Sequence, residues 1–155
     1  MTLNAEFVTA LRRVTQRWRA LWDAELRGSG QTLGRSRALL TLSQSGGSAM
    51  QRDVAEALSV EGPTLVRLLD GLERQGLIRR EPVPGNGRAN RIVLTEAAGP
   101  VVREVDGISE ALRERVLHGI PRAELETALR VLTTVAARLE GLGTASEKAP
   151  GEGQG

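Results

Sequence analysis

The stretch from Ser48 to Thr95 limits most tightly how this chain can fold. It reads SAMQRDVAEALSVEGPTLVRLLDGLERQGLIRREPVPGNGRANRIVLT. Two short runs carry apolar residues at helical spacing, and the residues between them, Ser59–Gly62, are typical of a tight turn. The second run stops at a glycine and is followed by a basic segment that contains Asn-Gly, a hairpin signal. The pattern therefore predicts the order helix, turn, helix, hairpin.

Capping signals set the expected bounds of the two helices. Ser48 followed by Gln51 predicts a capping box that opens the first helix, which carries Val54, Ala55 and Leu58 inward. Pro63 suits the first turn of the second helix, because its missing N–H would have no helical partner there. Helical spacing gives this helix a buried stripe and an outer face, expected to hold Leu65, Leu68, Leu69 and Leu72 on the one and Thr64, Arg67, Gly71 and Arg74 on the other.

The segment after the second helix predicts a β-hairpin. Gly76 supplies a left-handed C-cap, with Leu77 folding back on the helix. Two short strands, Ile78–Val83 and Asn90–Leu94, flank a turn at Pro84–Arg88. The fold class is therefore mainly α with a small β-wing, a winged helix-turn-helix.

Amphipathic helices are expected on both sides of this lobe. We predict helices from an Asn4 N-cap to about Arg27, from a Thr32 cap to about Ser43, from a Thr95 cap through Val116, and from Pro121 through Leu142. The last helix has an apolar face wider than a small monomer can cover, which indicates a subunit interface. The expected domains are an N-terminal helix contributing to dimerisation (1–30), the winged helix-turn-helix lobe (31–95), C-terminal dimerisation helices (96–142) and a disordered tail (143–155).

Composition excludes several classes of protein. With no cysteine and one histidine among 155 residues, thiol chemistry and a His-rich metal site are excluded, and no cofactor is expected. No run of apolar residues is long enough for a membrane span, and the N-terminus has no signal-peptide pattern, so a cytoplasmic protein is expected. Residues 34–95 carry 9 arginines against 6 acidic residues, whereas residues 96–140 carry 6 against 8. The positive excess lies on the winged lobe, as an anionic partner such as DNA would favour.

Candidate DNA-binding residues follow from this layout. In a helix-turn-helix the second helix enters the major groove with its N-terminal residues on base edges, here Glu61, Pro63, Thr64 and Arg67. Arg67 suits a bidentate contact to guanine or a contact to phosphate. Arg88 at the wing tip suits a narrow minor groove, and the strand arginines Arg79, Arg80 and Arg91 suit phosphates. The alternative interpretation of any one arginine is a solvated surface charge beside an acidic neighbour, without a role in binding.

These motifs resemble the MarR family of bacterial transcriptional regulators, and within it the SlyA-type branch. The resemblance rests on EGPTLVRLLDGLERQGLIRR and GRANRIVLT, with WRAL at Trp18–Leu21 and LHGI at Leu117–Ile120, and it covers about residues 5–142. It implies a homodimeric regulator, a repressor by default, that reads a pseudo-palindromic operator in double-stranded DNA. It also implies that Arg67 is the recognition-helix arginine and Arg88 the minor-groove arginine of the wing.

The chain departs from the family pattern at three places. Asn86 and Gly87 replace an aspartate and an arginine of the wing, which predicts a less charged and more flexible tip. Asn90 replaces a basic wing residue and removes a phosphate contact. Arg35, Ser36 and Arg37 stand where relatives often carry histidine and tryptophan, which favours a more anionic ligand or none.

A small-molecule effector is the weaker part of the functional hypothesis. Many family members release DNA when aromatic carboxylates or phenolic compounds bind a cleft beside the dimer helices. Here Trp18 and Trp22 lie one helical turn apart, and with Arg35 and Arg37 they could border one cleft. The alternative interpretation of the two tryptophans is that they pack in the core or in a subunit interface and bind no ligand.

Two other functional classes have less support in the sequence. An enzyme has little support, because the chain lacks a cysteine nucleophile and a phosphate-binding loop, and its one histidine, His118, suits a helix C-terminus. A helical dimer that binds protein rather than DNA is the alternative that the altered wing keeps open.

Overall fold

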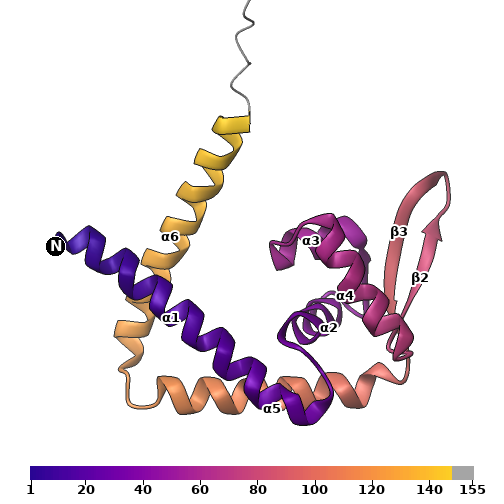
Figure 1. The fold of residues 1–155 in the computed structure, drawn as a ribbon, viewed down its shortest axis with the longest axis horizontal. Coiled ribbons are helices and arrows are strands. Elements are labelled where there is room, and N and C mark those ends of the chain that lie inside the picture. The colour runs from indigo at the N-terminus through magenta and orange to yellow at the C-terminus, as the bar shows by residue number, and fades with distance from the viewer. Residues whose placement is uncertain (148–155) are drawn as a thin grey trace, which may run out of the picture. The chain divides into compact units, whose positions relative to one another are not determined.

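The structure is a computed structural model that describes residues 1–147 (Figure 1). Its elements are α1 (Leu3–Leu26), the 3-10 helix η1 (Arg27–Ser29), α2 (Leu33–Gln44), β1 (Ser48–Met50), α3 (Gln51–Leu58), α4 (Gly62–Arg74), β2 (Ile78–Val83), β3 (Asn86–Leu94), α5 (Ala98–Leu117) and α6 (Arg122–Glu147). Residues 1–114 form one compact unit, and a second unit begins at Arg115. The predicted fold class, mainly α with a small β-wing, is confirmed.

The core lies where α2, α3 and α4 pack together against the base of the sheet. Its fully buried side chains are mostly leucines, joined by Ile92 from β3 and Ala98 at the start of α5. The α4 residues Leu65, Leu69 and Leu72 are at most 1% exposed, so the helical spacing in the sequence identified the inner face of α4 correctly. Burial of such side chains contributes about 1.5–3 kcal/mol each, which fixes α4 on α2.

The outer face of α4 is correctly predicted except at Gly71. Thr64, Arg67 and Arg74 are exposed, but Gly71 is buried. A Cβ atom at Gly71 would lie 2.7 Å from Nε of Arg35, because the Arg35 side chain of α2 lies across this position. A glycine at this point therefore lets the guanidinium approach the helix backbone.

The end of α4 is built as the sequence predicts. Gly76 has φ +73°, and the Leu77 N–H donates to the carbonyl of Leu72 at 3.0 Å, closing the turn that caps the helix. Leu77 is 5% exposed and packs into the core. This cap directs the chain from α4 straight into β2.

The beginning of α3 differs from the prediction. Ser48 does not cap α3, because Ser48–Met50 forms strand β1, which pairs antiparallel with β3. The N-cap position is Met50, whose side chain makes no capping hydrogen bond. A serine three residues before a helix is ambiguous in sequence, and here the pairing with β3 decides the outcome. The sheet order is β1-β3-β2.

The turn of the wing is shorter than the sequence predicts. Its turn is Pro84–Gly85, with Gly85 at φ +79°, and Asn86 already belongs to β3. Proline followed by glycine at the two central positions is the signature of a type II turn, and it takes precedence over Asn-Gly here. Pro82 pairs with Asn90 and Val83 with Asn86, which leaves Gly87–Ala89 as a bulge on β3.

Helix bounds elsewhere differ by a few residues. The Thr2 side chain, not that of Asn4, caps α1 by accepting from the Ala5 N–H, whereas Thr32 caps α2 as predicted. Thr95 does not cap α5, because its hydroxyl donates to the carbonyl of Gly76. Helix α6 continues to Glu147, so residues 143–147 are helical, and the rest of the predicted disordered tail lies outside the described residues. Across residues 1–147, every helix is too short or too polar to cross a membrane.

Candidate nucleic-acid interface

The N-terminal turn of α4 presents an exposed polar surface. Glu61 adopts an extended N-cap conformation, and Pro63 occupies the first turn, as expected for a residue without an N–H. Because the leucines of α4 face the core, the side chains of Thr64 and Arg67 project from the opposite face and are exposed. All four residues predicted to meet base edges, Glu61, Pro63, Thr64 and Arg67, therefore lie on one accessible surface.

Arg67 is free to bind a ligand from outside the chain. Within residues 1–147 its guanidinium forms no ion pair, in contrast to Arg79 and Arg80. A guanidinium with five unsatisfied donors on the second helix of a helix-turn-helix suits bidentate recognition of a base edge or a phosphate. The DNA contact of Arg67 stays a prediction.

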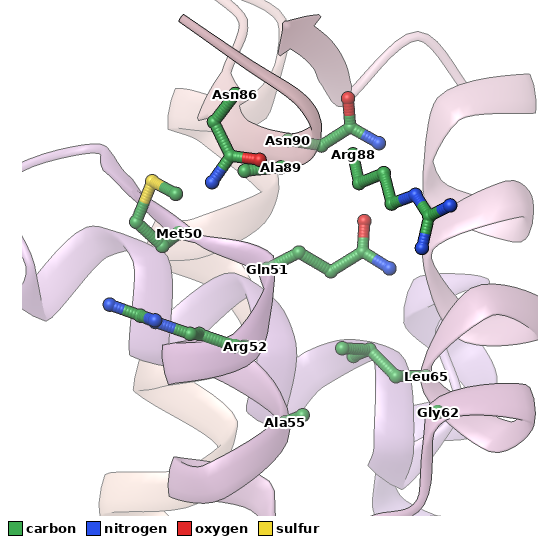
Figure 2. A pocket seen from close by; sticks show the side chains of 10 residues that line it. All are labelled: Met50, Gln51, Arg52, Ala55, Gly62, Leu65, Asn86, Arg88, Ala89 and Asn90. Carbon is green, nitrogen blue, oxygen red and sulfur yellow. The ribbon is translucent and has the colours of Figure 1, made fainter. Parts of the chain in front are cut away.

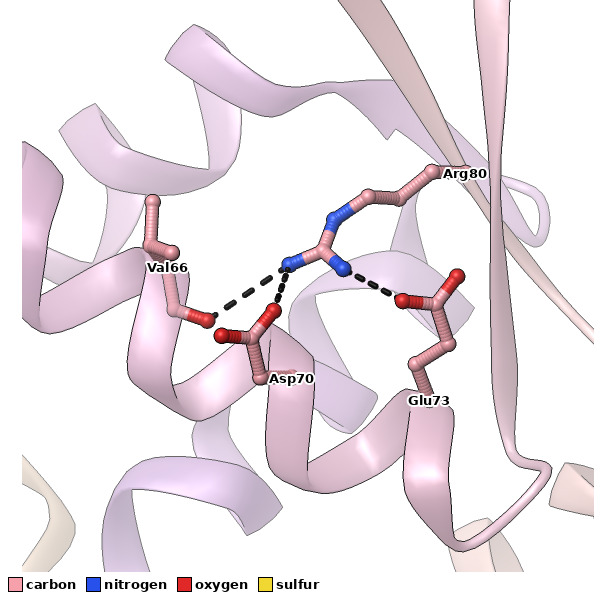
Figure 3. A network of polar contacts seen from close by, with 4 residues as sticks. All are labelled: Val66, Asp70, Glu73 and Arg80. Atoms are coloured by element: carbon pink, nitrogen blue, oxygen red, sulfur yellow. Dashed lines mark hydrogen bonds and ion pairs between the residues drawn. The ribbon is translucent and has the colours of Figure 1, made fainter.

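Arg80 has a different role from the one predicted. Its side chain is 21% exposed and bridges two carboxylates of α4, with Nη2 2.7 Å from Oδ1 of Asp70 and Nη1 bonded to Glu73 (Figure 3). Nη2 also lies 3.5 Å from the carbonyl of Val66. These contacts hold β2 against α4 and satisfy most of the guanidinium, so Arg80 is not available to phosphates in this arrangement.

The other strand arginines remain exposed. Arg79 pairs with Glu81 through Nε and Oε1 at 2.8 Å, and both side chains are about half exposed. Arg91 lies directly opposite Glu81 in the register of β2 and β3. An exposed pair of this kind contributes at most about 1 kcal/mol, so a phosphate can displace the carboxylate of Glu81 from Arg79.

A cleft of about 530 Å³ separates the helix-turn-helix from the wing (Figure 2). One wall is the first turns of α3 and α4, and the other is the bulged part of β3 that carries Arg88. The residues that line it are Met50, Gln51, Arg52, Ala55, Gly62, Leu65, Asn86, Arg88, Ala89 and Asn90. Arg88 thus lies in the bulge, beside the cleft, and not in the turn itself.

Sequence reasoning missed the polar residues on this cleft. Gln51 and Arg52 come from the first turn of α3, and Asn90 comes from β3. The Arg52 side chain is 86% exposed, and its nearest acidic partner, Asp53, is 3.8 Å away. The signal was available, because backbone N–H groups and cations at a helix start favour anions. This signal did not place the two residues on a cleft, because the other wall of the cleft is β3, which is distant in sequence.

The four residues predicted to border one ligand cleft do not do so. Trp18 and Trp22 line a cavity of about 160 Å³ with Ser109, Leu112 and Arg113 of α5. Arg35 lies across Gly71 instead, and Arg37 donates from Nη2 to the carbonyl of Leu58 at 3.3 Å. Burial, and secondarily the guanidinium of Arg19, lower the pKa of Arg37 from its ordinary value. The two arginines serve the packing of α2 on α3 and α4.

The tryptophan cavity contains a polar group without a hydrogen-bond partner. Nε1 of Trp22 is buried and has no hydrogen-bond partner among the described residues. The Ser109 hydroxyl is already used, because it donates to the Val105 carbonyl at 2.7 Å. A buried indole N–H without an acceptor costs about 1–3 kcal/mol, which a bound acceptor would recover. Residues 1–147 contain no cluster of three or more side chains suited to a metal ion.

The fold and the exposed, arginine-bearing α4 define a winged helix-turn-helix protein of the DNA-binding class. A model of the MarR family matches residues 29–89. The chain is 41% identical to the transcriptional regulator PA3341, whose crystal structure superposes with a TM-score of 0.79 and covers 87% of this chain and 98% of that one. The chain belongs to the MarR family of transcriptional regulators.

Two further solved structures support this assignment. A MarR-family regulator from Rhodococcus sp. RHA1 is 25% identical, with a TM-score of 0.76 over 88% of this chain and 96% of that chain. MepR from S. aureus, solved as a complex with DNA, is 26% identical, with a TM-score of 0.77 over 86% of this chain and 97% of that one. The family and the fold are those of transcriptional regulators and not of enzymes.

Proposed function

We propose that the protein is a cytoplasmic homodimeric regulator, by default a repressor, that binds a pseudo-palindromic operator in double-stranded DNA. We also propose that it belongs to the SlyA-type branch of its family. The observation that carries the proposal is Arg67, an unpaired guanidinium on the exposed face of α4. In this role, each α4 enters a major groove with Arg67 on a guanine edge or a phosphate. Thr64 meets a thymine methyl or a phosphate beside it.

The cleft between α3 and the wing supports a binding mode that uses both grooves. When α4 lies in the major groove and the wing reaches the adjacent minor groove, one sugar–phosphate strand must pass between them. The cleft is open and carries Arg52, Gln51 and Asn90 along its sides. We propose that this strand occupies the cleft, while Arg88 reaches the minor groove and Arg79 and Arg91 contact flanking phosphates.

Exposed apolar faces support dimerisation. On α6, Leu129, Leu139 and Leu142 are 63–69% exposed, and on α1 so are Val8 and Val14, at 62% and 59%. Exposed apolar side chains on one face of a helix mark an interaction site in a small protein. A second copy of the chain is the partner that an operator with two half-sites requires.

The direct test is binding to DNA that flanks the protein's own gene. Footprinting with the purified full chain should reveal a protected pseudo-palindrome, and fluorescence anisotropy should show affinity that falls steeply with salt. A protein that stays dimeric but protects no sequence and prefers none in a random-sequence selection would favour the alternative, a helical dimer that binds protein.

Arg52→Ala tests the strand in the cleft. Loss of one phosphate contact should lower affinity equally for all sequences and reduce the slope of log affinity against log salt by about 1. Arg122→Ala is the matched control, because Arg122 is an exposed cation on α6, outside the winged lobe. An Arg52→Ala variant with the salt slope of the wild type would show that the strand runs elsewhere.

A small anionic or aromatic effector is supported by the tryptophan cavity. An apolar cavity of about 150 Å³ accommodates a benzene ring, and the volume here is about 160 Å³. The free Nε1 of Trp22 can donate to a carboxylate or phenolic oxygen, and Arg113, whose Nη2 lies 3.1 Å from Oε2 of Glu110, lines the same cavity. We therefore propose an aromatic carboxylate, held by Trp22 and not by Arg35 or Arg37.

Benzoate is the simplest probe of this cavity. It should change the tryptophan fluorescence of the wild-type protein and weaken operator binding, whereas Trp22→Phe, which lacks the N–H donor, should bind benzoate more weakly while still binding DNA. If benzoate and salicylate change neither signal at millimolar concentration, the cavity is a packing feature of α1 and α5.

A further inference from the structure

The junction between α1 and α2 is joined to the far end of α4. Nε2 of Gln31 donates to Oε1 of Gln75 at 3.1 Å, across 44 residues of sequence. Nε2 of Gln75 lies 3.4 Å from the carbonyl of Gly30, close to the limit for a hydrogen bond. Gln75 is the C-cap residue of α4, so the two amides attach the end of this helix to the junction.

The junction is itself tied to α1. The carboxylate of Asp23 in α1 accepts from the Leu33 N–H, the first of α2, at 3.1 Å. The Ser29 hydroxyl donates to the carbonyl of Leu26, which is fully buried, and accepts from the N–H of Gln31. Gln31 is 6% exposed, an unusual position for a glutamine. A continuous set of hydrogen bonds therefore runs from α1 through the junction to α4.

Packing between α2 and α4 makes this attachment effective. A Cβ atom on Gly34 would lie 2.8 Å from Cδ2 of Leu68, and one on Gly71 would lie 2.7 Å from Nε of Arg35. The two helices thus approach closely at two points, one at Gly34 and Leu68 and the other at Arg35 and Gly71. At 1.5 Å per residue its 13 residues span about 20 Å, so a shift at Gln75 changes the direction in which Arg67 and Thr64 point.

We propose that Gln31 and Gln75 are positioning residues that set the angle of α4 relative to α1, and through it the half-site spacing that the dimer accepts. The inference rests on the proposed function, because α1 is taken to contribute to the dimer and α4 to read DNA. Neither glutamine touches DNA in this scheme. In helix-turn-helix dimers the distance between the two recognition helices selects the half-site spacing, so loss of the bond relaxes or shifts that selection.

The unusual environment of Gln31 allows a sharp test. Its Oε1 is buried without a partner among the described residues, so burial of this atom costs free energy. The hydrogen bond from Nε2 to Gln75 offsets part of this cost. Methionine has nearly the same shape and no hydrogen bond. Gln31→Met should therefore keep or raise the midpoint of thermal unfolding while removing the attachment. A change in spacing selection without loss of stability would not be expected of a residue that only stabilises the fold.

The experiment measures affinity for three operators, with the natural spacing and with one base pair inserted or removed between half-sites. Gln31→Met and Gln75→Met should each change the ratio of affinities by about twofold to tenfold, the range of one ordinary net hydrogen bond. Gln75→Met also removes the contact with the Gly30 carbonyl, so the double variant should change the ratio no further than Gln75→Met alone. Gln44→Met, at the exposed end of α2, should keep the wild-type ratio.

The outcomes separate this inference from the proposed function. Unchanged ratios in both variants, with normal affinity for the natural operator, would overturn the positioning role and leave DNA binding intact. An equal loss of affinity on all three operators, with a lowered unfolding midpoint, would also overturn it, as a purely structural effect. Absence of operator binding by the wild-type protein would refute the proposed function itself.

Discussion

Arg67→Ala is expected to weaken operator binding by about 1–3 kcal/mol, or roughly 5- to 150-fold, if Arg67 reads a base. The guanidinium is exposed on the outer face of α4 and has no ion-pair partner within residues 1–147, so its removal leaves no buried charge behind and costs the fold little. The loss should also relax discrimination at one base pair in each half-site. Anisotropy titrations against operators changed at single positions would measure both effects.

Two further variants make the Arg67 result specific. Arg67→Lys keeps the charge but loses the planar pair of donors, so it should retain non-specific binding and lose selectivity. Arg74→Ala removes an exposed arginine from the last residue of the same helix, far from its N-terminal turn, and should bind almost as the wild type does. If Arg67→Ala keeps the affinity and selectivity of the wild type, α4 does not recognise the operator through Arg67.

Features fixed by neighbours in sequence were predicted correctly. The leucines of α4 lie every three or four residues, Pro63 can only open a helix or break it, and Gly76 alone among its neighbours adopts φ +73° at no steric cost. These constraints act within one or two helical turns. The helix-turn-helix and the exposed face that carries Arg67 could therefore be assigned without a structure.

Features fixed by partners distant in sequence could not be assigned in this way. Arg80 looks like a free strand arginine until α4 brings Asp70 and Glu73 beside it. Gly71 looks solvent-facing until Arg35 from α2 lies across it. In both cases the position of the arginine in the sequence suggests a solvent-exposed or ligand-binding side chain, whereas a contact with α4 makes it part of the packing of the lobe.

Local signals also competed with one another. Ser48 could cap a helix or enter a strand, and pairing with β3 selected the strand. Pro-Gly and Asn-Gly stand side by side in the wing, and the proline fixed the turn on the first of them. Because the turn lies at Pro84–Gly85, Arg88 lies in a bulge of β3 and not in the turn. The cleft between this bulge and the first turn of α3 is formed by segments distant in sequence, so Arg52 could not be assigned to it from the sequence.

Leu139→Asp is expected to convert the proposed homodimer into a monomer. The Leu139 side chain is 63% exposed in the single chain and lies on the apolar face of α6, seven residues after Leu132 and three before Leu142. If a second chain covers this face, each dimer would bury two unpaired carboxylates, at a cost on the order of several kcal/mol per ion. Light scattering at micromolar concentration would show the monomer.

DNA binding then reports on the same change. A dimer links two α4 helices, so binding at one half-site makes binding at the other effectively intramolecular, and a monomer loses that advantage, worth about 10²- to 10⁴-fold. Leu139→Asp should therefore lose its affinity for the operator, while circular dichroism shows the helix content of the wild type. Thr134→Asp adds the same charge on the opposite, polar face of α6 and should leave both dimer and operator binding intact. If Leu139→Asp remains dimeric, the subunits meet through other surfaces, and the exposed residues Val8 and Val14 of α1 become the next to test.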